Sequence, residues 1–145
     1  VLAGPNTYFG NTTVTLGRVQ LDTGDNRFPI TTRLTLGSGA DAVEIDLNGR
    51  NQELAGIGVA TGSTVPNAVT ITNSSGTRSN LTVNTPADTP SSFRGVLFGN
   101  LALTKTGPSS LTLTNANTYS GPTHVAQGTL ALIGAGMTSP ISVAA

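Results

Sequence analysis

Residues 112 to 132 read TLTNANTYSGPTHVAQGTLAL, and residues 1 to 21 read VLAGPNTYFGNTTVTLGRVQL. The two stretches align without a gap at an offset of 111 positions, and their shared phrase Asn-Thr-Tyr-x-Gly contains both tyrosines of the chain. The identical positions in the first stretch are Leu2, Asn6, Thr7, Tyr8, Gly10, Thr12, Val14, Gly17 and Leu21. Internal repetition of this kind is typical of stacked architectures, in which each unit buries its face against the next.

Short segments of alternating apolar and polar residues fill the chain between the two stretches. Val43, Ile45 and Leu47, for example, share one face of a predicted strand, while Glu44 and Asp46 share the other. The same alternation predicts ten strands, at residues 12–16, 18–21, 33–36, 42–47, 68–72, 80–83, 101–104, 110–114, 123–126 and 129–133. It places inside the molecule Leu34, Leu36, Val69, Ile71, Leu81, Val83, Leu111, Leu113, Leu130 and Leu132. Apolar residues do not recur at the helical spacing, so almost no helix is expected.

Two architectures accept many short, half-buried strands: an antiparallel sandwich or barrel, and a parallel β-solenoid. Two-residue hairpin loops would favour the first, and Asn48-Gly49 is the one clear candidate. The gapless repeat favours the second. We therefore predict an all-β solenoid segment over residues 1–145, in which residues 1–111 form one unit and residues 112–145 begin the next.

A unit of 111 residues is too long for one solenoid turn, but it holds about four or five coils of ~22–28 residues. Both ends of the sequence align inside strands, where unpaired edges invite association. We expect the polypeptide to continue in both directions, or identical chains to stack end to end. The expected partners are therefore further copies of the protein itself.

Composition excludes several classes of function. Charged residues make up 10% of the chain, and seven basic residues balance seven acidic ones, so no field attracts nucleic acid. Cysteine is absent, which removes disulfides and thiolate metal sites. No apolar run reaches the ~18 residues of a membrane span, and we expect no membrane insertion by this segment and no cofactor.

Three carboxylates form the clearest candidate site. Glu44 and Asp46 lie two residues apart on the outer face of one predicted strand, and Asp41 just precedes it. Carboxylate clusters on such faces can hold calcium or perform acid–base chemistry on polysaccharides. The simpler interpretation is a solvated strand face with Arg33 or Arg50 nearby in an adjacent coil.

Two single residues also need an explanation. His124 is the only histidine and is expected to face solvent, because its neighbour Val125 points inward. Lys105, the only lysine, points inward by the parity of Leu101 and Leu103. Either the strand ends at residue 104 or the lysine stem packs inside while its amine reaches a turn carbonyl, and a carboxylate one coil away is the alternative partner.

Other matches to known motifs are weak. Gly56-Ile57-Gly58 is a fragment of a dinucleotide fingerprint without the following helix, and such glycines are better explained as turn residues. Three Asn-x-Ser/Thr sequences, at Asn11, Asn73 and Asn80, fit the glycosylation pattern in a chain rich in both residue types.

Residues 103–132 resemble the autotransporter-associated β-strand repeat, also called the passenger-associated transport repeat. Its pattern is matched at Leu103, Lys105, Gly107, Leu111, Leu113, Asn117, Thr118, Tyr119, Gly121, Thr123, Val125, Gly128 and Leu130, while Ser109 and Asn115 replace usual glycines. The first copy carries only the second half of the pattern, and DLNGRNQELAGIG at residues 46–58 resembles segments between such repeats in large bacterial surface proteins. The resemblance implies a right-handed parallel β-helix, with three short strands per coil and about five to six coils in this segment.

The resemblance implies an exported protein but no activity. We expect a non-enzymatic extracellular stalk or filament, with surface glycans or lateral self-association as further partners. The alternatives are a carbohydrate-active β-helix, such as a lyase or hydrolase, and a β-sandwich adhesin module. No catalytic, cofactor or metal residue is expected, and the motif residues are read as structural: Asn6, Thr7, Tyr8, Gly10, Gly17, Lys105, Gly107, Asn117, Thr118, Tyr119, Gly121 and Gly128.

The Asn-Thr-Tyr-x-Gly phrase is interpreted as a turn marker. Asn117 and Gly121 suit unusual backbone angles, Thr118 can bond to the local backbone, and Tyr119 can cover a corner of the core with its hydroxyl in water. The same roles are expected of Asn6, Thr7, Tyr8 and Gly10 in the first copy.

Overall fold

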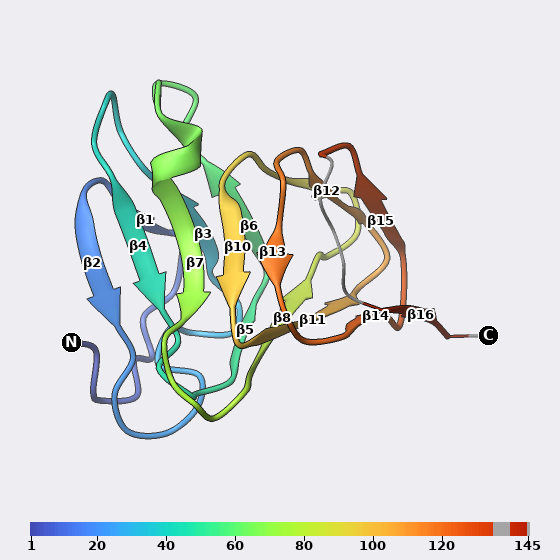
Figure 1. Cartoon of the computed structure of the whole chain (residues 1–145), viewed down its shortest axis with the longest axis horizontal. Helices are drawn as coiled ribbons and strands as arrows, with labels where there is room; N and C mark the ends of the chain where they lie inside the picture. Colours follow the sequence, from blue (N-terminus) through green and yellow to red (C-terminus); the bar gives the residue numbers. More distant parts are fainter. Residues whose placement is uncertain (135–139, 145) are drawn as a thin grey trace.

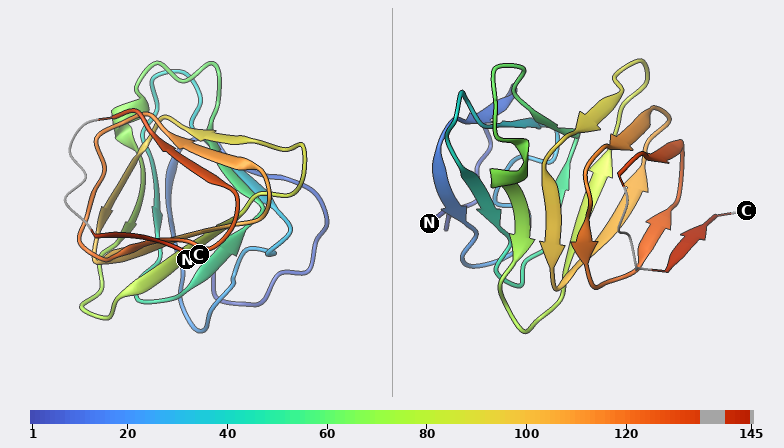
Figure 2. Two further views of the ribbon diagram at one scale, coloured as in Figure 1. Left: turned by 90° about the vertical axis from the view of Figure 1, so that its right-hand side faces the viewer. Right: turned by 45° about the horizontal axis from the view of Figure 1, so that its top comes forward.

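The computed structural model describes residues 1–134 and 140–144, and these form a three-sided parallel β-solenoid (Figure 1). All strand pairs are parallel, and the view along the axis has a triangular outline (Figure 2). The chain winds through the three sides in a fixed order, and connections between parallel strands of one sheet are right-handed. The predicted right-handed β-helix with three strands per coil is confirmed, and six strands stacked on one side give about six coils.

Each side of the prism is defined by its strands. Face A contains β1 (Thr12–Val14), β3 (Arg33–Leu36), β6 (Gly56–Val59), β9 (Ser91–Phe93), β12 (Ser110–Leu113) and β15 (Thr129–Leu132). Face B contains β2 (Gly17–Gln20), β4 (Val43–Asp46), β7 (Val69–Asn73), β10 (Val96–Gly99) and β13 (Thr118–Tyr119). Face C contains β5 (Gln52–Leu54), β8 (Ser79–Asn84), β11 (Leu101–Thr106), β14 (Thr123–Val125) and β16 (Ile141–Val143). One 3-10 turn, η1 (Pro66–Ala68), precedes β7.

Face A is interrupted once, between β6 and β9. These strands lie side by side, but a serine side chain takes the place of the backbone ladder. Ser91 Oγ accepts a hydrogen bond from Ile57 N at 2.9 Å and donates one to Ile57 O at 2.6 Å. The interruption therefore leaves neither backbone group of Ile57 unpaired in the buried interior.

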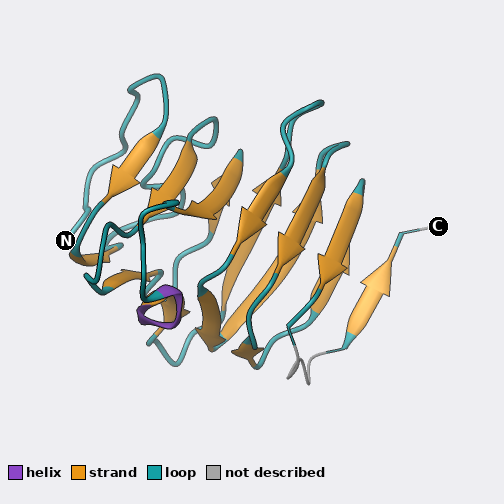
Figure 3. Cartoon of the chain, turned by 90° about the horizontal axis from the view of Figure 1, so that it is seen from above, coloured by secondary structure: helices purple, strands orange, loops and turns teal. Residues whose placement is uncertain are grey.

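The interior is a set of aliphatic columns in which each strand contributes the same positions as its neighbour. On face B, Ile45 is paired with Val19 on one side and Ile71 on the other, and Leu97 follows Ile71. The strands of successive coils run side by side along the axis (Figure 3). The predicted inward residues are buried except in the last coil, where Leu130 is half-buried and Leu132 is 37% exposed. Burial of each such side chain stabilises the stack by roughly 1.5–3 kcal/mol.

Sixteen strands lie in the described part of the chain, six more than alternation predicts. The additional strands are β5, β6, β9, β10, β13 and β16, and β11 continues to Thr106 rather than ending at residue 104. Several of the additional strands contain Gly, Ser or Gln, which favour extended structure weakly. Pairing with the coils on both sides outweighs their weak intrinsic preference for extended structure.

The Asn48-Gly49 pair makes the expected tight turn in a different topology. Both residues have a positive φ, 48° at Asn48 and 78° at Gly49, as in the two-residue turns that join hairpins. Here the turn forms the corner between β4 on face B and β5 on face C. The dipeptide therefore predicted the local backbone but not the strand arrangement.

Candidate functional site

The three predicted carboxylates do not form an open cluster. Asp41 is exposed in the turn before β4, and Glu44 is half-buried on the outer side of that strand. Asp46 has no exposed surface at all. The basic partner is Arg18 of β2, not Arg33 or Arg50 as expected: Arg18 Nε lies 2.8 Å from Glu44 Oε1, and Arg18 Nη2 lies 2.6 Å from Asp46 Oδ2.

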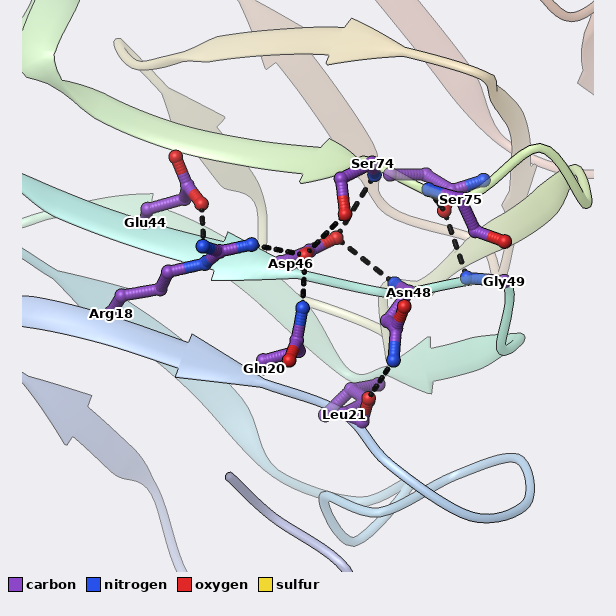
Figure 4. A network of polar contacts seen from close by, with 10 residues as sticks. Arg18, Gln20, Leu21, Glu44, Asp46, Asn48, Gly49, Ser74 and Ser75 are labelled. Carbon is purple, nitrogen blue, oxygen red and sulfur yellow. Dashed lines mark hydrogen bonds and ion pairs between the residues drawn. The ribbon is translucent and has the colours of Figure 1, made fainter.

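Asp46 accepts hydrogen bonds from five donors on three successive coils (Figure 4). Besides Arg18, Gln20 Nε2 donates to Oδ2 at 2.8 Å, and Ser74 donates through Oγ at 2.7 Å and through its backbone nitrogen at 3.0 Å. The backbone nitrogen of Asn48 donates to Oδ1 at 3.0 Å. We call this group, Arg18, Gln20, Asp46 and Ser74, the polar lock, because it joins the corner of one coil to the coils before and after it.

The polar lock sets the charge state of Asp46. Burial alone raises the pKa of this carboxyl, but the hydrogen bonds from Ser74, Gln20 and Arg18 outweigh burial and hold the pKa well below its ordinary value. The hydrogen bond to Asp46 also raises the pKa of Arg18. An anion whose lone pairs are already occupied is a poor general base and a poor calcium ligand, so the arrangement is structural.

A shallow groove of about 430 Å³ runs over the outer side of face B. Its polar lining comes from Arg18, Glu44 and Thr70, and Phe98 contributes an aromatic ring. Glu44 is the only carboxylate that lines it. The groove therefore lacks the pair of carboxylates that acid–base cleavage of a glycosidic bond requires.

Lys105 is fully buried in β11, and its ammonium is held by backbone carbonyls. Nζ donates to the carbonyl oxygens of Thr106 at 2.6 Å, Gly107 at 2.8 Å and Gln127 at 3.1 Å. This confirms the expectation that the stem packs inside while the amine reaches turn carbonyls. Burial lowers the pKa of Lys105, while the three bonds use all the donors of the ammonium. The residue ties its own turn to the next coil.

Asn117 and Tyr119 of the second repeat copy are buried, which differs from a turn marker at a wet corner. Asn117 Oδ1 accepts a hydrogen bond from Leu97 N of the preceding coil at 2.9 Å, and Nδ2 donates to Asn115 O at 2.7 Å. Tyr119 is only 1% exposed, and its hydroxyl lies 2.5 Å from Thr123 Oγ1. The expectation of a hydroxyl in water is wrong, because β13 continues the sheet and turns the ring into the core. Thr118 remains exposed beside it.

The glycines of this copy serve two different purposes. Gly107 and Gly128 have φ of 78° and 76°, whereas Gly121 and Asn117 do not adopt a positive φ, contrary to expectation. A Cβ on Gly121 would lie 2.6 Å from Leu101 O, and one on Gly128 would lie 2.3 Å from Gly107 O. Gly121 is therefore required by close coil contact, and Gly128 by both contact and backbone angle.

The first repeat copy keeps the Asn and Tyr side-chain contacts with less around them, but its backbone differs at Gly10, where φ is 104° and the equivalent Gly121 has no positive φ. Tyr8 hydroxyl lies 2.5 Å from Thr12 Oγ1, as in the second copy, but the ring is 41% exposed. Asn6 Nδ2 donates to Gly4 O at 3.0 Å, as Asn117 does two residues back, and also to Arg27 O of the next coil at 2.8 Å. Gly10 and Gly17 have positive φ, and a Cβ on either would meet nothing within 4 Å. Thr7 is exposed.

The two copies occupy different faces of the prism. Residues 12–14 form β1 on face A, but their equivalents, residues 123–125, form β14 on face C. Residues 17–20 form β2 on face B, and residues 128–131 fall largely in β15 on face A. From β1 the chain makes four coils to β12 and two further sides to β14, so the 111-residue offset equals four and two-thirds coils.

Coil length marks the repeat copies. Leu2 is bridged to Leu21, and Leu111 is paired with Leu130, so both copies form coils of 19 residues. Between them, the face B coils from Val19 to Ile45 and on to Ile71 have 26 residues each. The repeat copies therefore form coils seven residues shorter than the face B coils between them.

Asparagine at the corner after face B is a functional feature that the sequence reasoning missed. Asn73 is buried: its Oδ1 accepts from Gly49 N and Ser75 N, and its Nδ2 donates to the carbonyls of Thr77 and Asn100. It is therefore engaged in the corner and unsuited to carry a glycan. Its recurrence near the 26-residue coil spacing, at positions 48, 73 and 100, is the signal that could have revealed it.

The remaining candidates are surface or strand residues. His124 is exposed, as expected, with Nδ1 3.0 Å from Ser142 Oγ. Gly56 and Gly58 lie inside β6 without a positive φ, which corrects their interpretation as turn residues. Over residues 1–134 and 140–144 no group of three or more His, Cys, Asp or Glu side chains could hold a metal ion.

Comparison with known proteins agrees with this geometry. The passenger-associated transport repeat matches residues 1–21 and 103–132, which include the two repeat copies. No curated protein and no solved structure gives a significant match. The chain is therefore a parallel β-solenoid that contains two matches to the passenger-associated transport repeat.

Proposed function

We propose that the chain is a segment of an extended, non-enzymatic β-helical stalk or filament on the outside of a cell. One observation carries the proposal. The buried polar side chains that could be taken for a functional site form hydrogen bonds to neighbouring coils instead. Asp46 joins three coils, Lys105 binds the turn carbonyls of two, and Asn117 accepts from the coil before it. Chemistry that is committed to holding a stack together fits a mechanical role.

The passenger repeat supports an exported or surface location. In the described part of the chain no helix is long and apolar enough to cross a membrane. The outward positions of the strands are largely Thr and Asn with zero net charge. Such a surface offers hydroxyl and amide groups to glycans, or to a neighbouring stalk, without attracting charged molecules nonspecifically.

A carbohydrate-active β-helix is less well supported. It requires two carboxylates at a cleft, one to protonate the leaving group and one to act as base or nucleophile. The groove on face B offers Glu44 alone, because Asp46 is buried and occupied by the polar lock. No other observation favours catalysis.

Antibodies against residues 1–145 would test the location on cells that make the parent protein. We expect intact cells to be labelled and surface protease to remove the label; labelling only after permeabilisation would contradict the proposal. The chain would also be incubated with neutral and acidic polysaccharides, with Glu44→Gln as the matched control. Product release that Glu44→Gln abolishes would replace the stalk by the enzyme alternative.

A further inference from the structure

The first repeat copy lies at an edge of the described stack. Contacts that the second copy makes with its preceding coil have no counterpart there within the described residues. Within the described residues, a Cβ on Gly10 or Gly17 would meet nothing, whereas the equivalent Gly121 and Gly128 are pressed against carbonyl oxygens of the preceding coil. Phe9 is 95% exposed beside them. The contacts of the second copy with its preceding coil therefore serve as a template for the contacts that the first copy can make.

The geometry points to a specific occupant for this edge: the coil formed by residues 97–107 of another copy of the 111-residue unit. This inference rests on the proposed stalk and specifies how its units join. The coil would follow the template in the second copy, where Leu97 N donates to Asn117 Oδ1 and the carbonyls of Leu101 and Gly107 cover Gly121 and Gly128.

Transferred by 111 positions, each template contact has a receiver in the first copy. Asn6 receives the N–H of Leu97 of the preceding unit, Gly10 receives the Leu101 carbonyl, and Gly17 receives the Gly107 carbonyl. Thr7 is the equivalent of Thr118, which is paired with Phe98 in the sheet register. A larger residue than glycine at either receiving position would obstruct this approach, so the glycines of the edge fit a backbone partner at close range.

The junction also turns each unit relative to the last. Because one unit spans four and two-thirds coils, every added unit begins one face away from the start of the unit before it. Three units, or fourteen coils, restore the original face after ~67 Å at ~4.8 Å per coil. A feature that occurs once per unit, such as the polar lock, then recurs on all three sides of the stalk.

Disulfide trapping in an extended chain tests the proposed contact between residues 97–107 of one unit and the first repeat copy of the next. The full chain would carry, ahead of Val1, an added copy of residues 79–111, and the absence of cysteine makes any introduced pair unique. One variant combines Phe98→Cys in the added copy with Thr7→Cys, because paired strand neighbours lie within disulfide range. The matched control is Phe98→Cys with Thr118→Cys in the natural chain, where the pairing is known.

We expect the Phe98→Cys/Thr7→Cys pair to oxidise to the same extent as the control. A second variant replaces Thr7→Cys by Gln20→Cys, which reports a stack whose units keep the same face, because Gln20, Asp46, Thr72 and Phe98 share one register column on face B. Crosslinking at position 20 instead of 7, or at neither while the control forms, would overturn the inference. Surface labelling of the parent protein is independent of this readout. Failure of the proposed contact between units can therefore be distinguished from failure of the proposed extracellular stalk.

A glycine substitution gives a second readout. In the natural chain Gly17→Ala has free space around its Cβ, and in the extended chain it would face a carbonyl as Gly128→Ala does. We expect Gly17→Ala to lower the melting temperature at least twice as far in the extended chain as in the natural one. An equal decrease of the melting temperature in both chains would contradict the proposed contact between units.

Discussion

The two repeat copies share nine identical positions but are buried on opposite sides. Tyr119 is 1% exposed and Tyr8 is 41% exposed, whereas Leu132 is 37% exposed and its equivalent Leu21 is completely buried. The second copy is covered by the coil before it and, along β14, by β16 after it, whereas the first copy is covered by the coil after it. The motif therefore keeps the side-chain contacts of its Asn and Tyr, while the neighbouring coil decides how much each motif residue contributes to stability.

The copies are also fastened differently. Arg18 and Gln20 tie the first copy to Asp46 of the following coil, and their equivalents in the second copy are Thr129 and Ala131, which cannot do so. The second copy is tied instead by Lys105 of the preceding coil, through Gln127 O. The two copies are thus fastened to adjacent coils by different residues.

The largest expected difference is between the two tyrosines. Tyr119→Ala should lower the free energy of unfolding by about 4 kcal/mol, because it leaves a cavity in a packed core. Tyr8→Ala removes a ring that is partly in water and should cost about 1 kcal/mol. Urea unfolding of both variants measures the difference, and equal losses would show that burial by the neighbouring coil does not control the motif.

Glycine substitutions test the same comparison with backbone strain held constant. Gly128 and Gly17 have similar positive φ, 76° and 85°, so alanine costs about 1 kcal/mol of conformational strain at each. Gly128→Ala should cost about 2 kcal/mol more, because its Cβ would lie 2.3 Å from Gly107 O. Thermal melts of the pair give this steric contribution, which a similar loss in both variants would refute.

The paired asparagines should show a smaller difference. Asn117→Ala leaves the buried N–H of Leu97 without its acceptor and should cost about 2 kcal/mol. Asn6→Ala loses bonds from Nδ2 to two carbonyls at an open edge and should cost about 1 kcal/mol. Hydrogen exchange at Leu97 distinguishes the two: the amide should exchange faster in Asn117→Ala and remain unchanged in Asn6→Ala.

Much of this architecture could be predicted because a solenoid is encoded locally. Alternation at Val43, Ile45 and Leu47 identified the buried face, and the 111-residue repeat pointed to a stack. The inward lysine was also predictable, since the parity of Leu101 and Leu103 continues to Lys105. These features depend on residues close in sequence.

Features that depend on contact between coils could not be predicted in the same way. Arg18 reaches Asp46 from 28 positions away, a distance set by coil length, and coil length varies with the loops at the corners. Ser91 replaces a ladder that alternation cannot detect, and Tyr119 is buried by a two-residue strand too short to have a period. The placement of the two repeat copies on different faces could not be predicted for the same reason. The offset of 111 residues corresponds to four and two-thirds coils, and this number follows only from the individual coil lengths.

Acid should destabilise the first repeat copy more than the second. This is the smallest of the expected differences between the two copies. The pKa of Asp46 is lower in the folded chain than in the unfolded one, where it is near ~3.9. The stabilisation is therefore complete at neutral pH and is lost as the pH falls below ~4 toward the folded pKa. Amides of β2 should then exchange faster, while those of β14, which the polar lock does not contact, should change less.

The variant Asp46→Asn separates the polar lock from general acid effects. It keeps the shape of the side chain but cannot accept from every donor, so β2 should already exchange faster at pH 7. Further exchange of β2 on acidification should be smaller than in the natural chain, because the titrating group is gone. If the variant and the natural chain loosen in parallel between pH 5 and pH 2, other carboxylates control the acid response and the two copies are not fastened as Arg18 and Lys105 indicate.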